Sequence, residues 1–107
     1  MPKDNVFRKL RITPELKALI INACEFHHRL PSNFIEWVIL KRKRMNKPEF
    51  ETITDDRMGE KEDMRFVCKR ELWEYLKANS PERGASYVLE SWLRTEIKKV
   101  KYTSTAG

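Results

Sequence analysis

The chain has 107 residues, enough for one small domain, and carries 22 Lys and Arg against 16 Asp and Glu, for a net charge of +6. The charge is divided: residues 1–50 carry a net +6, residues 51–63 a net −4 and residues 64–107 a net +4. Two basic segments around an acidic one are typical of a protein that binds a polyanion, and charge alone leaves DNA, RNA and an anionic membrane open. No apolar run reaches the roughly 18 residues of a membrane span, and the polar residues after Met1 are unlike a signal peptide, so we expect a cytoplasmic protein with no membrane partner.

The first half of the chain predicts a strand followed by two helices. Residues 7–13 alternate between apolar and polar, which is typical of a half-buried strand. Its inward face holds Leu10 and Ile12, and its outward face holds Lys9, Arg11 and Thr13. Pro14 suits the first position of a helix with Thr13 as its N-cap, and apolar residues at helical spacing continue to about residue 27 or 28. After a break at residues 29–31, Ser32 is the candidate N-cap of a second helix, which ends in the basic run 41–44.

The second half repeats this order. Residues 64–69 alternate again, a helix follows with Leu72, Tyr75 and Leu76 facing inward, and residues 79–84 break the chain before a last helix capped by Ser86. The halves can be aligned, because Glu15-Leu16 matches Glu71-Leu72 at an offset of 56, while Ser32 matches Ser86 at an offset of 54. Two copies of one unit are therefore predicted.

The predicted architecture is mainly α with a two-stranded antiparallel β-ribbon. A unit of about 40 residues cannot close a core by itself, and its strand has unpaired edges. Pairing the two strands over four helices solves both problems and makes an intramolecular pseudo-dimer. The copies are residues 6–44 and 64–101, joined by a polar and acidic linker, residues 45–63, which has the composition of a mobile connection and a reach of about 25 Å. Together they form one folded unit.

The outward faces of the two strands are the candidate DNA-reading surface. The residues expected to contact bases are Lys9, Arg11, Thr13, Arg65, Val67 and Lys69. A two-stranded ribbon fits the major groove of B-DNA, where Lys and Arg bind guanine edges and Val67 could meet a thymine methyl. The alternative is a solvated strand edge protected by charge, which is common for one strand. Two such strands, each followed by two helices, favour DNA.

The start of each second helix is the candidate site for DNA phosphates, because free backbone N–H groups and the helix dipole attract anions there. The residues expected to contact phosphates are Arg29, Ser32, Asn33, Arg83, Ser86 and Tyr87. Ordinary helix capping by the two serines is the alternative, and both can hold together. For the basic run 41–44, a solvated helix end is expected, with contact to DNA or a partner as the alternative.

The residues that could serve catalysis or bind a metal do not assemble into a site. Cys24 and Cys68 are isolated in apolar segments and are expected to be buried thiols, with a disulfide as the less favoured alternative. Adjacent His27 and His28 point about 100° apart on a helix, and no second ligand pair accompanies them. We therefore expect no catalytic residues, no metal, no cofactor and no enzymatic activity.

The segment Lys9-Leu10-Arg11-Ile12-Thr13-Pro14-Glu15-Leu16, with Ser32-x-x-x-Glu36 after the turn, resembles the Arc/MetJ ribbon-helix-helix superfamily of DNA-binding proteins. Two copies joined by a basic helix end and Lys47-Pro48-Glu49-Phe50 are most similar to the TraY family of relaxosome proteins of conjugative plasmids. The resemblance covers about residues 6–47 and 64–100.

This resemblance implies sequence-specific binding of double-stranded DNA at a plasmid origin of transfer. The protein would help a separate relaxase to nick DNA, would contact that relaxase and other relaxosome proteins, and would regulate transcription of transfer genes. It would be a monomer in solution, with several copies side by side on DNA. An antitoxin or a phage or plasmid repressor of the same class is the alternative, although the segment after Val100 is short for a toxin-binding tail. Because Val67 stands where the first copy has Arg11, we expect a non-palindromic target.

Overall fold

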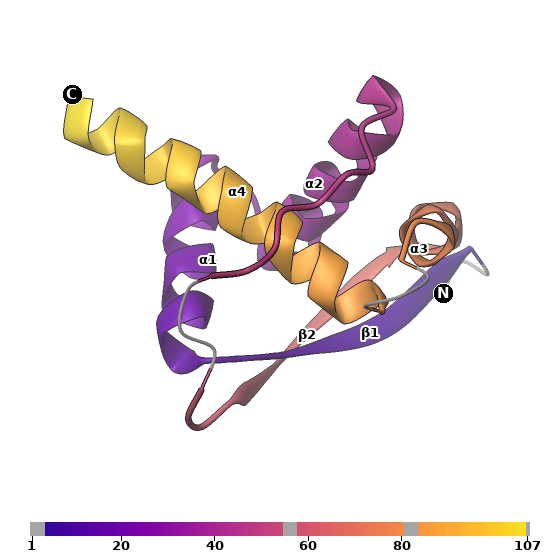
Figure 1. Cartoon of the computed structure of the whole chain (residues 1–107), viewed down its shortest axis with the longest axis horizontal. Helices are drawn as coiled ribbons and strands as arrows, with labels where there is room; N and C mark the ends of the chain where they lie inside the picture. Colours follow the sequence, from indigo (N-terminus) through magenta and orange to yellow (C-terminus); the bar gives the residue numbers. More distant parts are fainter. Residues whose placement is uncertain (1–3, 55–57, 81–83, 107) are drawn as a thin grey trace.

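The computed structural model describes residues 4–54, 58–80 and 84–106, with side chains as far as Val100. The elements in chain order are β1 (Asn5–Ile12), α1 (Pro14–Phe26), α2 (Pro31–Met45), β2 (Glu62–Lys69), α3 (Arg70–Ala78) and α4 (Ala85–Ala106). The strands form an antiparallel two-stranded sheet, and the helices cover one of its faces (Figure 1). A mainly helical chain with a two-stranded antiparallel sheet was predicted and is confirmed. None of the described helices is both long and apolar enough to cross a bilayer.

The pairing of β1 with β2 sets which residues share a face. Lys9 lies opposite Arg65, and the register extends from Asn5 opposite Lys69 to Ile12 opposite Glu62. Alternate residues point to opposite faces of a strand, so one face of the sheet is apolar. Its buried residues are Val6, Leu10, Ile12, Met64, Phe66 and Cys68. Both strands begin earlier than the sequence predicted, β1 at Asn5 and β2 at Glu62.

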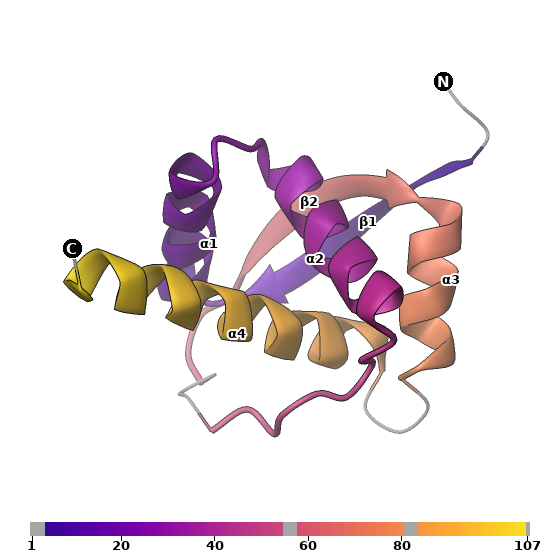
Figure 2. The same cartoon turned by 90° about the horizontal axis from the view of Figure 1, so that it is seen from above.

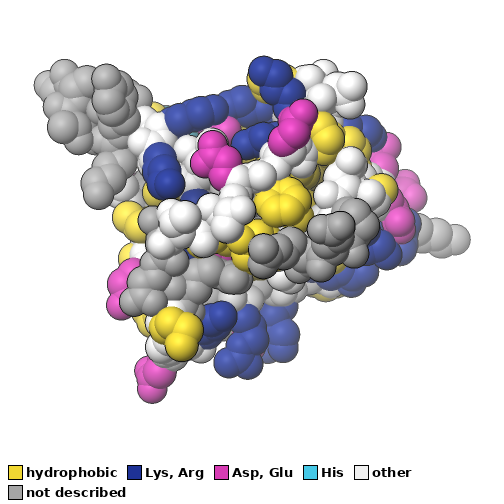
Figure 3. Space-filling model, in the orientation of Figure 1, with side chains coloured by type: hydrophobic (Ala, Val, Ile, Leu, Met, Phe, Trp, Pro, Cys, Tyr) yellow, Lys and Arg dark blue, Asp and Glu magenta, His cyan; other side chains and the backbone are white. Residues whose placement is uncertain are grey.

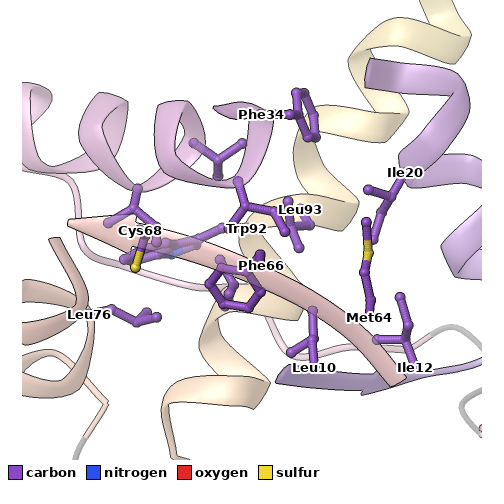
Figure 4. Packing of buried hydrophobic residues seen from close by; sticks show 14 of the residues in the cluster. Leu10, Ile12, Ile20, Phe34, Met64, Phe66, Cys68, Leu76, Trp92 and Leu93 are labelled. Atoms are coloured by element: carbon purple, nitrogen blue, oxygen red, sulfur yellow. The ribbon is translucent and has the colours of Figure 1, made fainter. Parts of the chain in front are cut away.

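The core lies between this apolar face and the helices. Leu10 and Phe66 of the strands, Phe34 of α2 and Trp92 of α4 all belong to this core (Figure 4), and all four side chains are almost fully buried. The view from above shows α2 crossing over the strands, with α1 and α3 at opposite ends (Figure 2). α1 packs against α4, and α2 against α3 and α4. Because each half of the chain packs on the other, the two halves share one core.

The starts of two helices differ from the prediction. Thr13 is the N-cap of α1, as predicted, and its Oγ1 accepts a hydrogen bond from the N–H of Leu16 at 3.3 Å. The prediction of Ser32 as an N-cap is wrong: Leu30 holds that place in an extended conformation, and Pro31 begins α2. Pro is favoured at the first helical position because that N–H has no partner within the helix. The last helix begins at Ala85, so Ser86 lies inside its first turn.

The first part of the connection between α2 and β2 is hydrogen-bonded to α4. Ser91 Oγ of α4 accepts a hydrogen bond from the N–H of Glu51 at 3.1 Å and donates one to the Glu51 carbonyl at 2.7 Å. Trp92 Nε1 donates to the carbonyl of Glu49 at 3.0 Å. The connection therefore runs alongside α4 (Figure 1). Its polar composition predicted a mobile linker, whereas over residues 49–53 side chains of α4 supply hydrogen-bond partners for its backbone.

Candidate nucleic-acid interface

The outward face of the two strands carries most of the residues predicted to contact bases. Lys9, Arg11, Arg65 and Lys69 are exposed there, and Val67 is half-buried. In the space-filling view, Lys and Arg side chains gather along the lower edge, where Figure 1 places the strands (Figure 3). The helices cover the opposite face of the sheet, so this face is open to solvent.

Thr13 does not belong to this face. It follows the last residue of β1, is 7 % exposed, and its hydroxyl is used to cap α1. A side chain committed to a helix N-terminus cannot also reach a base edge beyond the sheet. Thr13 is therefore poorly placed for the base contact predicted for it, while its prediction as an N-cap is confirmed.

Two outward residues were not predicted from the sequence. Phe7 lies on the same side of β1 as Lys9 and is 59 % exposed, and Asp63 lies opposite Arg11 on β2. The carboxylate of Asp63 is 3.6 Å from Lys9 Nζ and 4.0 Å from Arg11 Nε. Extending the alternation of the first strand from Lys9 back to Phe7 is the signal that could have found this residue. Asp63 was not predicted because β2 begins at Glu62, two residues before the predicted start of the strand.

The first turn of α2 lies beside β2. Ser32 Oγ accepts a hydrogen bond from the N–H of Val67 at 3.1 Å, which ties the helix to the strand. No side chain caps this turn, so its first backbone N–H groups stay available to an anion. Arg29 and Asn33 are exposed at the same end, and they help to line a shallow cleft of about 350 Å³. The guanidinium of Arg29 stacks over Trp37, 5.2 Å from the ring centre.

The corresponding turn of α4 is arranged differently. Ser86 is exposed in the first turn, whereas Tyr87 faces the connection, where its hydroxyl accepts a hydrogen bond from the N–H of Ile53 at 2.9 Å. The ring of Tyr87 also packs edge-on against Phe50. Arg83, the third residue predicted for this end, lies outside the described residues. Ser86 therefore remains a candidate contact for a phosphate, because its side chain is exposed in the first turn of α4.

In the basic run at the end of α2, two cations form hydrogen bonds within the protein and two are exposed to solvent. Lys41 Nζ donates to Glu96 Oε1 at 3.1 Å, and Arg42 donates to the carbonyls of Lys47 and Glu49. Lys43 and Arg44 are exposed. The expected solvated helix end is therefore limited to the last two cations.

The two cysteines are buried and free, as predicted. Burial raises the pKa of both thiols, that of Cys68 to about 11, where Glu36 adds to the effect and Arg8 opposes it. A thiol held protonated is a poor nucleophile and a poor metal ligand. Within the described part of the chain, no three His, Cys, Asp or Glu side chains come together in a way that could hold a metal ion.

No known protein family, no curated protein and no solved structure matches this chain. Its function is therefore inferred from the geometry of the described residues.

Proposed function

We propose that this chain binds double-stranded DNA sequence-specifically, with the outward face of β1 and β2 in the major groove. One observation carries the proposal: Lys9 lies directly opposite Arg65 at the centre of an exposed sheet face whose other side is covered by the core. A two-stranded ribbon matches the width of the major groove, and Lys and Arg donate to guanine O6 and N7. Arg11 and Lys69 extend the positive face along both strands.

The two halves act as two copies of a ribbon-helix-helix unit that form a pseudo-dimer within one chain. The strand register supports this, because residue 65 is the counterpart of residue 9 at the 56-residue offset, and the two are paired. A two-fold axis through that pair exchanges β1 with β2. It also exchanges α1 with α3 and α2 with α4, which fits the packing of α1 on α4 and of α2 on α3. The protein is then a monomer of 12.8 kDa before it meets DNA, which light scattering measures directly.

The start of α2 binds a phosphate beside the groove. Its uncapped N–H groups at Ser32 and Asn33 supply donors, and exposed Arg29 supplies positive charge. The hydrogen bond between Ser32 and Val67 keeps this turn at a constant distance from the ribbon. Ser86 takes the equivalent place at α4. Tyr87 is left out of the proposed contacts because its hydroxyl and ring serve the connection.

The resemblance to the TraY family extends the proposal to a biological role. The protein would sit beside an origin of transfer, on its own or as several copies side by side, and assist a relaxase that cuts the DNA. The repeated strand-helix-helix order of the chain supports this role. Relaxase and pilus genes beside this gene are the expected surroundings, and a toxin gene there would favour the antitoxin alternative.

Two variants with the same loss of charge test the proposal. The first combines Lys9→Ala with Arg65→Ala, and the second combines Lys43→Ala with Arg44→Ala at the far end of α2 (Figure 1). A duplex selected from a random pool by the wild-type protein, and a random duplex of equal length, are titrated with each variant by fluorescence anisotropy.

The ribbon variant should lose most of its preference for the selected duplex, since it lacks the two central donors of the base-contacting face. The control should keep that preference and lose a similar, small factor on both duplexes, because distant cations contribute only general attraction. For about six neutralised phosphates, wild-type affinity should fall about a thousandfold between ~50 and ~200 mM salt. Equal effects of the two variants, or no binding to any duplex at low salt, would overturn the proposal.

A further inference from the structure

The outward face of the ribbon contains three cross-strand rows centred on Lys9 and Arg65, and the row of Asn5 with Lys69 lies beyond them. The rows are Phe7 with Val67, Lys9 with Arg65, and Arg11 with Asp63. Residues paired across two antiparallel strands lie within about 5.5 Å of each other and act as one contact surface. Each row is therefore placed to meet its own part of a DNA site.

The two outer rows would be chemically identical if the two copies were identical. At the 56-residue offset, residue 63 is the counterpart of residue 7, and residue 67 is the counterpart of residue 11. The register pairs 7 with 67 and 11 with 63, so the two-fold axis through the central row exchanges the outer rows. In this chain one outer row is apolar and the other is an acid–base pair. These three rows thus have an apolar end, next to Asn5 and Lys69, and a charged end.

Asp63 is the residue that most needs a specific partner on DNA. Its side chain is 37 % exposed on a face that would approach phosphates, and a carboxylate there is repelled by them unless a donor receives it. The neighbouring cations, Lys9 Nζ at 3.6 Å and Arg11 Nε at 4.0 Å, hold it at the surface without covering it. In the major groove the N4 amino group of cytosine donates to Asp, and guanine O6 and N7 accept from Arg. Asp63 and Arg11 together match a C·G base pair.

The apolar end has the opposite preference. Phe7 is 59 % exposed, directly opposite half-buried Val67, so the pair presents hydrocarbon to solvent at one end of the ribbon. The thymine methyl group is the apolar feature of the major groove, and contact with it removes both surfaces from water. A C·G pair has no methyl group in the major groove and therefore offers this row no apolar contact.

We infer that the ribbon reads an asymmetric site in one orientation, with thymine beneath Phe7 and Val67 and a C·G pair beneath Asp63 and Arg11. Asp63 is then a specificity-determining residue, which weakens binding to every duplex lacking a donor at its position. The inference rests on the proposed binding of DNA in the major groove. It deepens that proposal, because it assigns a base class to each end of the ribbon.

The test is selection of bound duplexes from a random pool by three proteins: the wild type, Asp63→Asn, and the double variant Asp63→Phe with Val67→Arg. The double variant gives both strands the outward sequence Phe, basic, Arg and so makes the two outer rows alike. Far-UV circular dichroism and thermal unfolding verify that each variant folds. Asp63→Asn keeps the size of an exposed side chain, so it tests the same idea with little effect on folding.

The wild type should select a non-palindromic site with a T-rich end and a C·G end, and the double variant should select a palindrome with T-rich ends. Asp63→Asn should reduce the preference for C·G at its position by at least about fivefold and raise affinity for random duplexes. A palindrome selected by the wild type, or an unchanged site with Asp63→Asn, overturns the inference while leaving DNA binding intact. Failure of the wild type to bind any duplex overturns the proposed function itself.

Discussion

Lys41 Nζ lies 3.1 Å from Glu96 Oε1 and joins α2 to α4 across 55 residues of sequence. The side chain of Glu96 is 5 % exposed, and Lys99 is its other cation, 3.3 Å from the same oxygen. A buried carboxylate loses its hydration, so it stabilises a fold only when its partners replace that hydration. The pair therefore helps to hold the two halves of the chain together.

Replacing Lys41 with Met should lower the free energy of unfolding by about 1–3 kcal/mol, because Glu96 then keeps, among the described residues, only the more exposed Lys99 as a cation partner. Lys43→Met on the same helix is the matched control, and its exposed position predicts a change within about 0.5 kcal/mol. Urea unfolding followed by circular dichroism measures both. Similar values for the two variants would contradict a structural role for Lys41.

Ser32→Ala should remove the hydrogen-bond acceptor of the Val67 N–H and lower the free energy of unfolding by about 0.5–1.5 kcal/mol. The amide of Val67 should then exchange with deuterium faster, which NMR resolves at this single residue. Ser86→Ala serves as the control, since Ser86 holds the corresponding position in the other half and is exposed. Unchanged exchange at Val67 would show that Ser32 does not secure the strand.

In the native protein, the rate of amide hydrogen exchange should alternate between slow and fast at successive residues of the connection. The N–H groups of Glu51 and Ile53 bond to Ser91 and Tyr87 and should exchange slowly, whereas exposed Thr52 and Thr54 should exchange quickly. Ser91→Ala should speed exchange at Glu51 more than at Ile53, and Tyr87→Phe should do the reverse. Uniformly fast exchange over residues 51–54 would mean that the connection is not docked on α4.

The free energy of unfolding should fall as the pH rises from about 9 to 11. Burial raises the pKa of Cys68 from 9.0 to about 11, so across this range the unfolded chain loses the thiol proton while the folded chain keeps it. Below pH 9 both states are protonated, and the stability is independent of this group. The loss by pH 11 is about 2–3 kcal/mol.

Cys68→Ala isolates this contribution. The variant is less stable at neutral pH because it leaves a cavity, but it lacks the thiol, so its stability should fall less between pH 9 and 11. Cys24 and Tyr75, whose pKa values burial also raises, are present in both proteins and cancel in the comparison. Parallel pH profiles for the two proteins would show that Cys68 ionises with an ordinary pKa in the folded state.

Patterns among neighbouring residues were enough to predict the local elements and their order. The alternation of Leu10 and Ile12 with charged residues depends only on residues close together in the sequence. The same is true of the cap that Thr13 forms on α1 before Pro14. The exposed positions of Lys9, Arg11, Arg65 and Lys69 followed from the same period of two. Composition predicted the behaviour of the connection less well than periodicity predicted the strands. It indicates a mobile segment, but it carries no information about the side chains of α4 that accept hydrogen bonds from the backbone of this segment.

Contacts between residues far apart in the sequence follow from the packing of the elements and could not be predicted from local patterns. The register placed Asp63 opposite Arg11 and Phe7 opposite Val67, which gave the outward face two unlike ends. Because α2 packs against β2, Ser32 accepts a hydrogen bond from the Val67 N–H and does not cap its helix. Because the connection lies along α4, the Tyr87 hydroxyl accepts a hydrogen bond from the Ile53 N–H. These contacts join residues at least 34 positions apart, so they depend on how the two halves pack and not on any local pattern.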